Sequence, residues 1–333
     1  SSGKTTVKEM TAFILAKRYR TLKSAKSYNN YIGLALTAAG LKDSHRVLVA
    51  ELGMNKKGEI KELCRAVKLD AAVITNVGRA HIGRLKSLEQ TAAAKAEIAE
   101  GLKPGGVFVI NADDRFYRFF KKFYSGRVIS FGVKNRADII ARRLKEKNGI
   151  LIKGAGKTIN VRTGFSGAHS LYNAAASAAA ALFLGATPAD VKKGLEKFSM
   201  PGFMRFEVKR MKGFTLINDC YNANPDSFRA AAEALKTGGY RNITAVVSDM
   251  LELGKASGKL HREAGALLAK AGVKRLIAYG ARADDYIKGF KKDGIKVRGI
   301  YEAAKKAAET KAGGTIFVKG SRANKMERLE KLL

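Results

Sequence analysis

Gly3, Lys4 and Thr5 stand directly before the first apolar helical pattern of the chain. Gly-Lys-Thr at such a position is the second half of a phosphate-binding loop, in which backbone N–H groups and the lysine contact phosphates and the threonine hydroxyl binds Mg²⁺. Such a loop connects a buried strand to a helix, so it predicts an α/β fold. The same residues also occur by chance at helix starts in lysine-rich chains, and the motif alone leaves both interpretations open.

Short apolar runs that end in polar residues recur along the first half of the chain. The expected elements are strands at residues 46–53, 71–76 and 106–110, a polar loop at 27–33 and a helix at 87–102. Strands separated by helices are typical of a parallel sheet, whose strands present their carboxyl ends at one edge. We therefore expect Gly3, Glu51, His81 and Asn111 to meet at one edge of a single sheet.

The pattern changes in the second half of the chain. The expected elements there are short β segments with glycine turns at 127–161, helices at 169–184 and 188–198, and strands at 214–217, 243–247, 275–278, 295–300 and 315–318, with helices between them and a closing helix. The helical pattern breaks at residues 199–202, which predicts domains at 1–199 and 200–333. The renewed alternation predicts that the second domain is Rossmann-like.

The charge of the chain is strongly positive. Its 333 residues include 63 Lys and Arg against 29 Asp and Glu, a net charge of +34. Such a surface attracts polyanions, and ATP or a nucleotide-linked substrate would be attracted by the same field. The basic residues are spread over the whole chain, aromatic residues make up only 8%, and no nucleic-acid-binding motif occurs. We therefore do not expect nucleic acid to be the partner.

Other features exclude several classes of protein. No apolar run is long enough to span a membrane, and no signal-peptide pattern opens the chain. The two cysteines are far apart, which predicts neither a disulfide framework nor a zinc site. With four histidines, metal binding would depend mainly on carboxylates. A cytoplasmic location is the expectation.

Motifs in a fixed order along nearly the whole chain resemble the Mur ligase family. They lie at residues 3–6, 29–33, 51–55, 58–60, 75–81, 94–98, 111–114, 169 and 173, 204–207, 218–225, 249–254 and 319–322. The resemblance implies an ATP-dependent, Mg²⁺-using amide ligase of peptidoglycan precursor synthesis, with a P-loop central domain and a Rossmann-like carboxyl-terminal domain. It is greatest to members that add D-alanyl-D-alanine to UDP-N-acetylmuramoyl tripeptide through an acyl phosphate, and it implies a monomer.

The resemblance also implies roles for residues of the first domain. Phosphates and one Mg²⁺ would be bound by the loop at Gly3, Lys4, Thr5 and Thr6. The metal sites would further use Glu51, His81 and Lys95, the last as a lysine carbamylated by CO₂. The adenine side is implied for His169 and Asn173, and substrate contacts for Asn29 and Asn30. Outside that family, Glu51 would be a solvated strand-end carboxylate and Lys95 an exposed helix lysine.

Further roles are implied in the second domain. The resemblance implies an arginine that reaches the ATP phosphates at Arg205, a ribose contact at Asp219, nucleotide contacts near Asn222, and substrate contacts at Asn224, Lys319, Ser321 and Arg322. A loop after the last strand would expose the cations of Lys319 and Arg322 to the carboxylate of the dipeptide. Domain closure about Pro201 and Gly202 would assemble the site.

Two departures from the family pattern leave alternatives open. The family's amino-terminal UDP-binding domain and the strand before the P-loop are not in this sequence, so the chain that begins at Ser1 is expected to bind ATP weakly and not to ligate peptides. The family is also not usually so basic. The alternatives are a basic P-loop protein that binds nucleic acid and a non-catalytic remnant that binds ATP.

Overall fold

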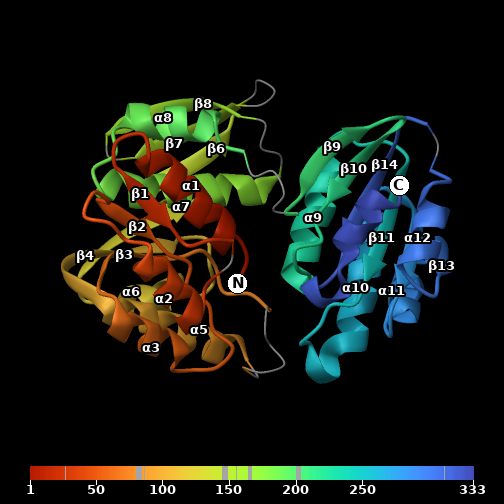
Figure 1. Cartoon of the computed structure of the whole chain (residues 1–333), viewed down its shortest axis with the longest axis horizontal. Helices are drawn as coiled ribbons and strands as arrows, with labels where there is room; N and C mark the ends of the chain where they lie inside the picture. Colours follow the sequence, from red (N-terminus) through yellow and green to blue (C-terminus); the bar gives the residue numbers. More distant parts are fainter. Residues whose placement is uncertain are drawn as a thin grey trace. The chain divides into compact units, whose positions relative to one another are not determined.

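The computed structural model describes residues 1–26, 28–79, 85, 87–144, 149–154, 156–163, 167–199, 204–310 and 312–333. The chain forms two compact units, each with its own core (Figure 1). Unit 1 contains Ser1–Gly78, Arg84–Phe165 and His169–Ser199, and unit 2 contains Arg79–Gly83, Ser166–Ala168 and Met200–Leu333. None of the described helices is long and apolar enough to cross a membrane.

Unit 1 contains two sheets. A two-stranded parallel sheet pairs β1 (Thr21–Lys23) with β2 (Val47–Val49). A six-stranded sheet has the order β3-β4-β5-β6-β7-β8, with parallel pairing from β3 to β6 and antiparallel pairing from β6 to β8. Its strands are β3 (Leu69–Ile74), β4 (Leu102–Asn111), β5 (Arg127–Gly132), β6 (Ile139–Arg143), β7 (Gly149–Gly154) and β8 (Lys157–Arg162).

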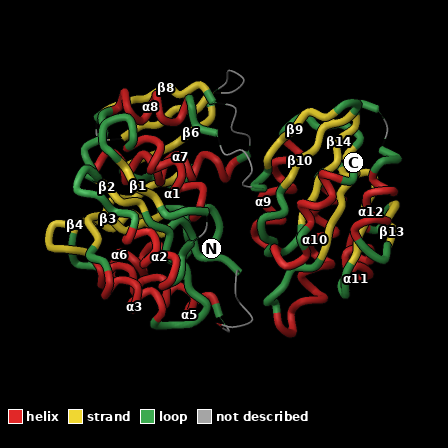
Figure 2. Tube along the Cα trace, viewed as in Figure 1, coloured by secondary structure: helices red, strands yellow, loops and turns green. Residues whose placement is uncertain are grey.

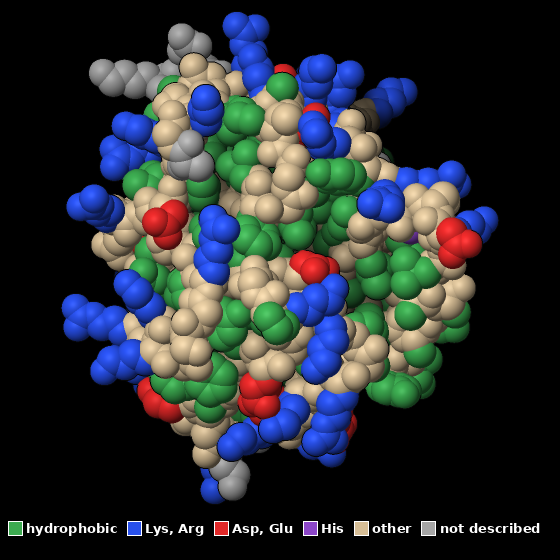
Figure 3. Space-filling view, turned by 90° about the vertical axis from the view of Figure 1, so that its left-hand side faces the viewer, with side chains coloured by type: hydrophobic (Ala, Val, Ile, Leu, Met, Phe, Trp, Pro, Cys, Tyr) green, Lys and Arg blue, Asp and Glu red, His purple; other side chains and the backbone are tan. Residues whose placement is uncertain are grey.

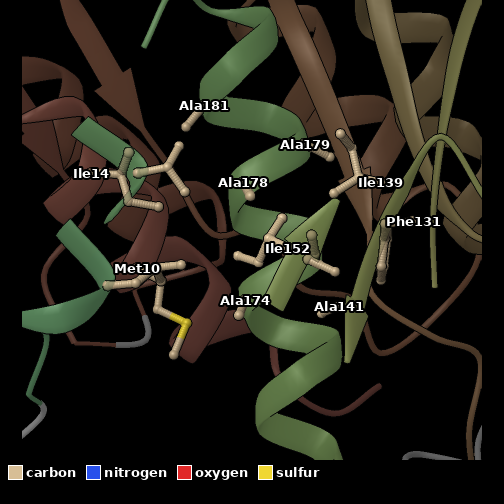
Figure 4. Close-up of a cluster of buried hydrophobic side chains, with 14 of the residues drawn as sticks. Met10, Ile14, Phe131, Ile139, Ala141, Ile152, Ala174, Ala178, Ala179 and Ala181 are labelled. Carbon is tan, nitrogen blue, oxygen red and sulfur yellow. The ribbon is translucent and has the colours of Figure 1, made fainter. Parts of the chain in front are cut away.

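The helices of unit 1 interleave with these strands. They are α1 (Lys4–Leu15), α2 (Tyr31–Ala39), α3 (Glu59–Ala66), α5 (Leu88–Ala96), the 3₁₀ helix η1 (Glu97–Gly101), α6 (Tyr117–Phe123), α7 (Ala168–Phe183) and α8 (Pro188–Glu196). Helix α7 is almost entirely buried, and most of its buried side chains are alanines. Ala174, Ala178 and Ala181 lie between Met10 and Ile14 of α1 and the strand residues Ile139 and Ile152 (Figure 4). Small side chains let helix and sheet pack this closely.

Unit 2 is a doubly wound sheet of order β13-β12-β11-β14-β10-β9, parallel except for β9 at one edge. Its strands are β9 (Glu207–Met211), β10 (Phe214–Asn218), β11 (Ile243–Ser248), β12 (Val273–Tyr279), β13 (Asp293–Lys296) and β14 (Gly314–Lys319). Its helices are α9 (Pro225–Thr237), η2 (Gly254–Ala256), α10 (Ser257–Lys270), α11 (Ala283–Phe290), α12 (Ile300–Ala307), η3 (Arg322–Asn324) and η4 (Met326–Lys331).

Alternate residues along the strands of unit 2 point into two different hydrophobic cores. Val247 faces the core built with α9, α10 and α11, whereas Val246 faces the core built with α12 and η4. The strands therefore lie between α9 on one side and α12 on the other (Figure 2). This arrangement confirms the Rossmann-like expectation for the second half of the chain.

Several local predictions are wrong. The expected loop at 27–33 contains the start of α2, because the Asn30 side chain accepts a hydrogen bond from Gly33 N and begins a helix at Tyr31. The expected strand at 295–300 ends at Lys296, and Ile300 begins α12. The closing helix is a pair of 3₁₀ helices, η3 and η4.

The prediction of a single sheet in the first domain is also wrong. The expected strand at 46–53 is shortened to the half-buried β2, whose hydrogen-bonded neighbour in the described chain is β1. Glu51 therefore follows a strand of the small sheet, and Asn111 ends a strand of the large one. The three-residue strand β1 has too short an apolar pattern to be visible in the sequence.

Candidate active site

The turn into α1 has the geometry that only glycine adopts easily. Gly3 has a φ of +84°, and its carbonyl accepts the first helical hydrogen bond from Val7 N at 2.8 Å. A Cβ at this position would lie 2.5 Å from Asn173 Oδ1 in α7. Larger residues would therefore be excluded both by the backbone and by the neighbour. The close approach joins the expected phosphate loop to the first part of α7, where His169 lies one turn before Asn173.

The hydroxyl of Thr5 meets the carboxylate of Glu51 in the interior of unit 1. Thr5 Oγ1 donates a hydrogen bond to Glu51 Oε2 at 2.6 Å, and Asn29 Nδ2 donates to Glu51 Oε1 at 2.9 Å. Ser24 Oγ accepts from Glu51 N at 3.1 Å. Both Thr5 and Glu51 are buried. The start of α1 and the segment after β2 are thus brought together, although Glu51 follows a strand of the small sheet and not of the single sheet that the sequence predicted.

The carboxyl ends of β3 and β4 hold the residues just before the loop. Ser2 O accepts from Thr75 Oγ1 at 2.8 Å and from Asn76 Nδ2 at 2.9 Å, and Ser2 N donates to Asn76 Oδ1 at 2.9 Å. Asn111 Nδ2 donates to Thr75 O at 3.1 Å. The loop is therefore fixed from the large sheet as well as from the small one, and the ends of β2, β3 and β4 converge on it.

Lys95 lies at the end of α5, close enough to Lys4 to be affected by its charge. Burial, and then the ammonium of Lys4, lower the pKa of Lys95 to about 8, while the carboxylate of Asp114 acts in the opposite direction. Lys4 itself donates to Ser1 O at 3.1 Å. Lys4 at the start of α1 and Lys95 near it create a positive field suited to a polyphosphate.

The described residues contain no cluster of three or more His, Cys, Asp or Glu side chains that could hold a metal by itself. His81, which the resemblance places in the metal site, lies outside the described residues, as do Pro201 and Gly202. At the start of α1, the side-chain oxygen atoms of Thr5 and Glu51 could act as hard ligands of a metal ion. Hard oxygen donors are what Mg²⁺ prefers.

Two residues of unit 1 have structural contacts that the sequence did not reveal. Asn30, expected to contact substrate, caps α2 through its side chain. Glu97 is buried and accepts hydrogen bonds from Gly58 N at 2.8 Å and Lys61 N at 3.3 Å, at the start of α3. In the sequence, Glu97 looks like a solvated helix carboxylate. Its position within the motif at 94–98 was the feature that could have indicated a structural role.

In unit 2, Asp219 and Lys319 bond to each other. Lys319 Nζ donates to Asp219 Oδ2 at 2.5 Å and to Asn222 O at 3.4 Å, and the Lys319 side chain is 1% exposed. Lys319 is the last residue of β14 and not part of a loop after it. The expectation of an exposed cation at Lys319 is therefore wrong, because the strand end buries the ammonium against the loop after β10.

The remaining predicted residues of unit 2 lie around the same strand ends. The guanidinium of Arg205 lies over the ring of Tyr221, 4.1 Å from its centroid. Asn224 caps α9 through a capping box with Ser227. Ser321 Oγ accepts from Leu251 N at 2.9 Å, and the half-exposed Arg322 pairs with Glu327 at 3.1 Å. Loops after β10, β11 and β14 thus meet at the carboxyl edge, where doubly wound sheets bind ligands.

Comparison with known proteins identifies the class. Residues 1–181 match the Mur ligase middle domain, and residues 204–322 match the family described as Mur ligase, glutamate ligase domain. The chain belongs to the Mur ligase family, and the expected P-loop domain followed by a Rossmann-like domain is confirmed. Family membership favours the ligase over the two alternatives that the sequence left open.

Within that family, relatives about 30% identical to this chain are named as D-alanyl-D-alanine-adding ligases. The UDP-N-acetylmuramoyl-tripeptide--D-alanyl-D-alanine ligase of Bacillus subtilis (strain 168) is 35% identical over 99% of this chain and 74% of its own length. The crystal structure of MurF from Acinetobacter baumannii superimposes with a TM-score of 0.91 at 31% identity, covering 99% of this chain and 74% of that one. MurF ligase from Thermotoga maritima, solved in complex with ADP, gives 0.88 at 28% identity, covering 100% and 77%.

Proposed function

We propose that the chain supplies the ATP-binding and amide-forming units of a ligase that adds D-alanyl-D-alanine to UDP-N-acetylmuramoyl tripeptide. The observation that carries this proposal is the junction of Thr5, Glu51 and Gly3 at the start of α1. A glycine turn, a helix start and a hydroxyl–carboxylate pair are the parts that a Mg²⁺–triphosphate site requires. The two substrates come from the name of relatives that match nearly the whole chain, UDP-N-acetylmuramoyl-tripeptide--D-alanyl-D-alanine ligase.

The residues of unit 1 fit ATP and Mg²⁺. Mg²⁺ in such sites uses one or two protein carboxylates together with phosphate oxygens, and Glu51 with the Thr5 hydroxyl supplies protein oxygens of this kind. Lys4 and Lys95 provide positive charge beside them. Carbamylation of Lys95 would change that cation into a further oxygen ligand. Thr6, His169 and Asn173 would contact the nucleotide, and Asn29 would orient Glu51.

The reaction places negative charge where these cations lie. ATP transfers its γ-phosphoryl group to the carboxylate of the tripeptide, and the amine of the dipeptide then attacks the acyl phosphate and releases phosphate. Lys4 would stabilise the charge that develops on the transferred group. Arg205 would contact the phosphates from unit 2, where Asp219 and Asn222 would meet the ribose side and Ser321 and Arg322 the dipeptide carboxylate.

Three further assignments belong to the proposal. The domain limits are 1–199 and 200–333, which the two compact units and the two family matches support. The reaction takes place in the cytoplasm, where ATP and UDP-linked precursors are available. The ligase acts as a monomer.

The test is ADP release by a full-length ligase that carries this chain. We expect release to require both the UDP-linked tripeptide and D-alanyl-D-alanine, and to be abolished by Lys4→Ala. Lys42→Ala, which removes an exposed lysine after α2, serves as the matched control. Near-normal release by Lys4→Ala at saturating ATP would refute the phosphate-loop assignment, and release without the dipeptide would refute the ligase.

A further inference from the structure

Helix α6 of unit 1 has an unusual outward face. Phe116 and Phe120 are 9% and 1% exposed and pack into the core, where Phe120 meets Phe108 edge-on at 6.1 Å. Phe119 and Phe123, one turn apart, are instead 39% and 43% exposed, with their ring centroids 6.0 Å apart. A short helix that is held in the core by Phe120 and by the preceding Phe116 therefore offers a second pair of aromatic rings to the surroundings.

The exposed rings are surrounded by positive charge. Arg118, Phe119, Lys122 and Phe123 of α6 follow one another at the helical spacing i, i+1, i+4 and i+5, and together with Arg115, two residues before the helix, we call them the α6 outer face. Each of these residues is exposed, and Lys121 lies at their flank. The sequence contains no Asp or Glu from residue 115 to residue 137.

Little of this charge is neutralised within the protein. Arg115 pairs with the exposed Glu89 at 3.1 Å. Arg118, Lys121 and Lys122 form no ion pair with any other described residue. Lys and Arg also outnumber Asp and Glu on the molecular face in Figure 3, in keeping with the net charge of +34.

We propose that the α6 outer face binds the surface of an anionic lipid bilayer. Aromatic rings on a cationic helix face are the composition of interfacial helices, in which the rings enter the headgroup boundary and the cations meet lipid phosphates. At seven residues α6 is far too short to span a bilayer, so it would lie on the surface. Two rings combined with several cations provide the paired signals that stable surface binding needs.

The geometry favours a bilayer over a single-stranded nucleic acid. Stacking of bases requires aromatic faces that are open to successive bases along a basic groove. Phe119 already packs against Phe120 at 5.5 Å and against Phe123 at 6.0 Å, which covers part of its ring. The outer face is also carried on an exposed helix surface, which suits a flat partner.

The α6 outer face extends away from the nucleotide end of unit 1. The chain leaves β4 at Asn111, beside the phosphate loop, and passes through α6 to Tyr124, whose hydroxyl donates to Gly106 O at 3.3 Å. Gly106 belongs to the first half of β4, and Arg127 then begins β5 opposite Val107. Phe123 therefore lies toward the amino ends of these strands, away from the end of β4 that holds the loop at Gly3, whereas Arg115 lies nearer that end.

The test is co-sedimentation of the chain with vesicles of phosphatidylcholine alone or mixed in equal parts with phosphatidylglycerol. We expect binding to the anionic vesicles only. Phe119→Ser with Phe123→Ser, and separately Arg118→Gln with Lys122→Gln, should each weaken it about tenfold or more. The matched control, Lys192→Gln with Lys193→Gln on α8, removes the same charge from another exposed site and should change binding less than about twofold.

Four results would overturn the proposal. Equal weakening by the α8 control would show that only net charge matters. Equal binding to both kinds of vesicle, or undiminished binding by the two α6 variants with unchanged melting temperatures, would remove the outer face from the interaction. Loss of affinity for a single-stranded oligonucleotide in the α6 variants, without loss of vesicle binding, would assign the face to nucleic acid.

Discussion

Thr5 and Glu51 lie 46 positions apart in the chain and share one buried hydrogen bond. The bond stabilises the folded state, because a buried carboxylate without hydrogen-bond donors costs free energy and a buried hydroxyl needs an acceptor. In the proposed ligase the pair has a second role, since both oxygens would be presented to Mg²⁺.

Replacing Thr5 by valine tests both roles of the pair. Thr5→Val keeps the shape of the side chain and removes the hydroxyl, so we expect a loss of about 1–3 kcal/mol in the free energy of unfolding. ATP turnover should fall roughly a hundredfold, because an Mg²⁺ ligand is lost. Thr5→Ser, which keeps the hydroxyl, should be close to the parent in both. Equal turnover in the valine and serine variants would mean that the hydroxyl binds no metal.

The lowered pKa of Lys95 gives a prediction that depends on pH. A carbamate forms when the neutral amine attacks CO₂, making an N–C bond and releasing a proton. With a pKa of about 8, about a tenth of the amine is neutral at pH 7, and the neutral fraction rises as pH rises through the pKa. We expect ¹³C-labelled bicarbonate to give a carbamate resonance that grows between about pH 7 and pH 9.

Lys95→Ala is the control for that experiment. The variant should lack the resonance and should have lowered ligase activity, and a short-chain carboxylic acid should partly restore the activity by supplying the missing oxygens. Added bicarbonate should not restore it, because the amine is gone. A resonance that survives in Lys95→Ala, or unchanged kinetics, would leave Lys95 as an ordinary lysine.

At the scale of elements, helices α10 and α11 of unit 2 pack so closely that only glycine fits at two contact positions. A Cβ on Gly265 would lie 2.1 Å from Tyr286 O, and a Cβ on Gly289 would lie 1.9 Å from Arg262 O. Each helix therefore contacts the backbone of the other through a glycine. Such contacts leave no flexible side chain that could move aside.

We expect Gly265→Ala to force α10 and α11 apart and to cost about 1–3 kcal/mol or more in the free energy of unfolding, measured by urea denaturation. Gly299→Ala is the matched control, because a Cβ there meets nothing within 4 Å and the backbone is extended. The control should change stability by less than about 1 kcal/mol. Equal effects of the two substitutions would contradict close packing of the two helices.

The sequence predicted elements with strong patterns and missed those that depend on distant partners. The central strands of unit 2 were foreseen, because the apolar runs of β11 and β14 are continuous and buried on both faces. Strands β1 and β9 were missed, since they are short, only half-buried and paired at sheet edges. The two-sheet arrangement of unit 1 could not be predicted, because pairing is not visible in local patterns.

The candidate site shows the same division. Motif positions identified Thr5, Glu51 and Asn173, which the structure brings near the start of α1. The burial of Lys319 against Asp219 was not foreseen, because 100 positions separate them and a lysine after a strand is usually solvated. The roles given to these residues stay predictions.

At the scale of the whole molecule, the net charge of +34 acts on stability as well as on partners. Like charges repel most strongly in the compact state, and salt screens that repulsion. We expect the melting temperature to rise when sodium chloride is increased from about 0.02 M to about 0.5 M. A melting temperature that falls over this range would show that ion pairs outweigh the repulsion among the unpaired cations.

The central proposal is that a full-length ligase containing this chain activates the tripeptide carboxylate as an acyl phosphate. The most direct measurement uses UDP-linked tripeptide labelled with ¹⁸O in that carboxylate, together with ATP and D-alanyl-D-alanine, and determines the label in the released products by mass spectrometry. Attack of the dipeptide amine on an acyl phosphate transfers one labelled oxygen to inorganic phosphate, which is the result we expect. Unlabelled phosphate, or label found in AMP, would contradict it.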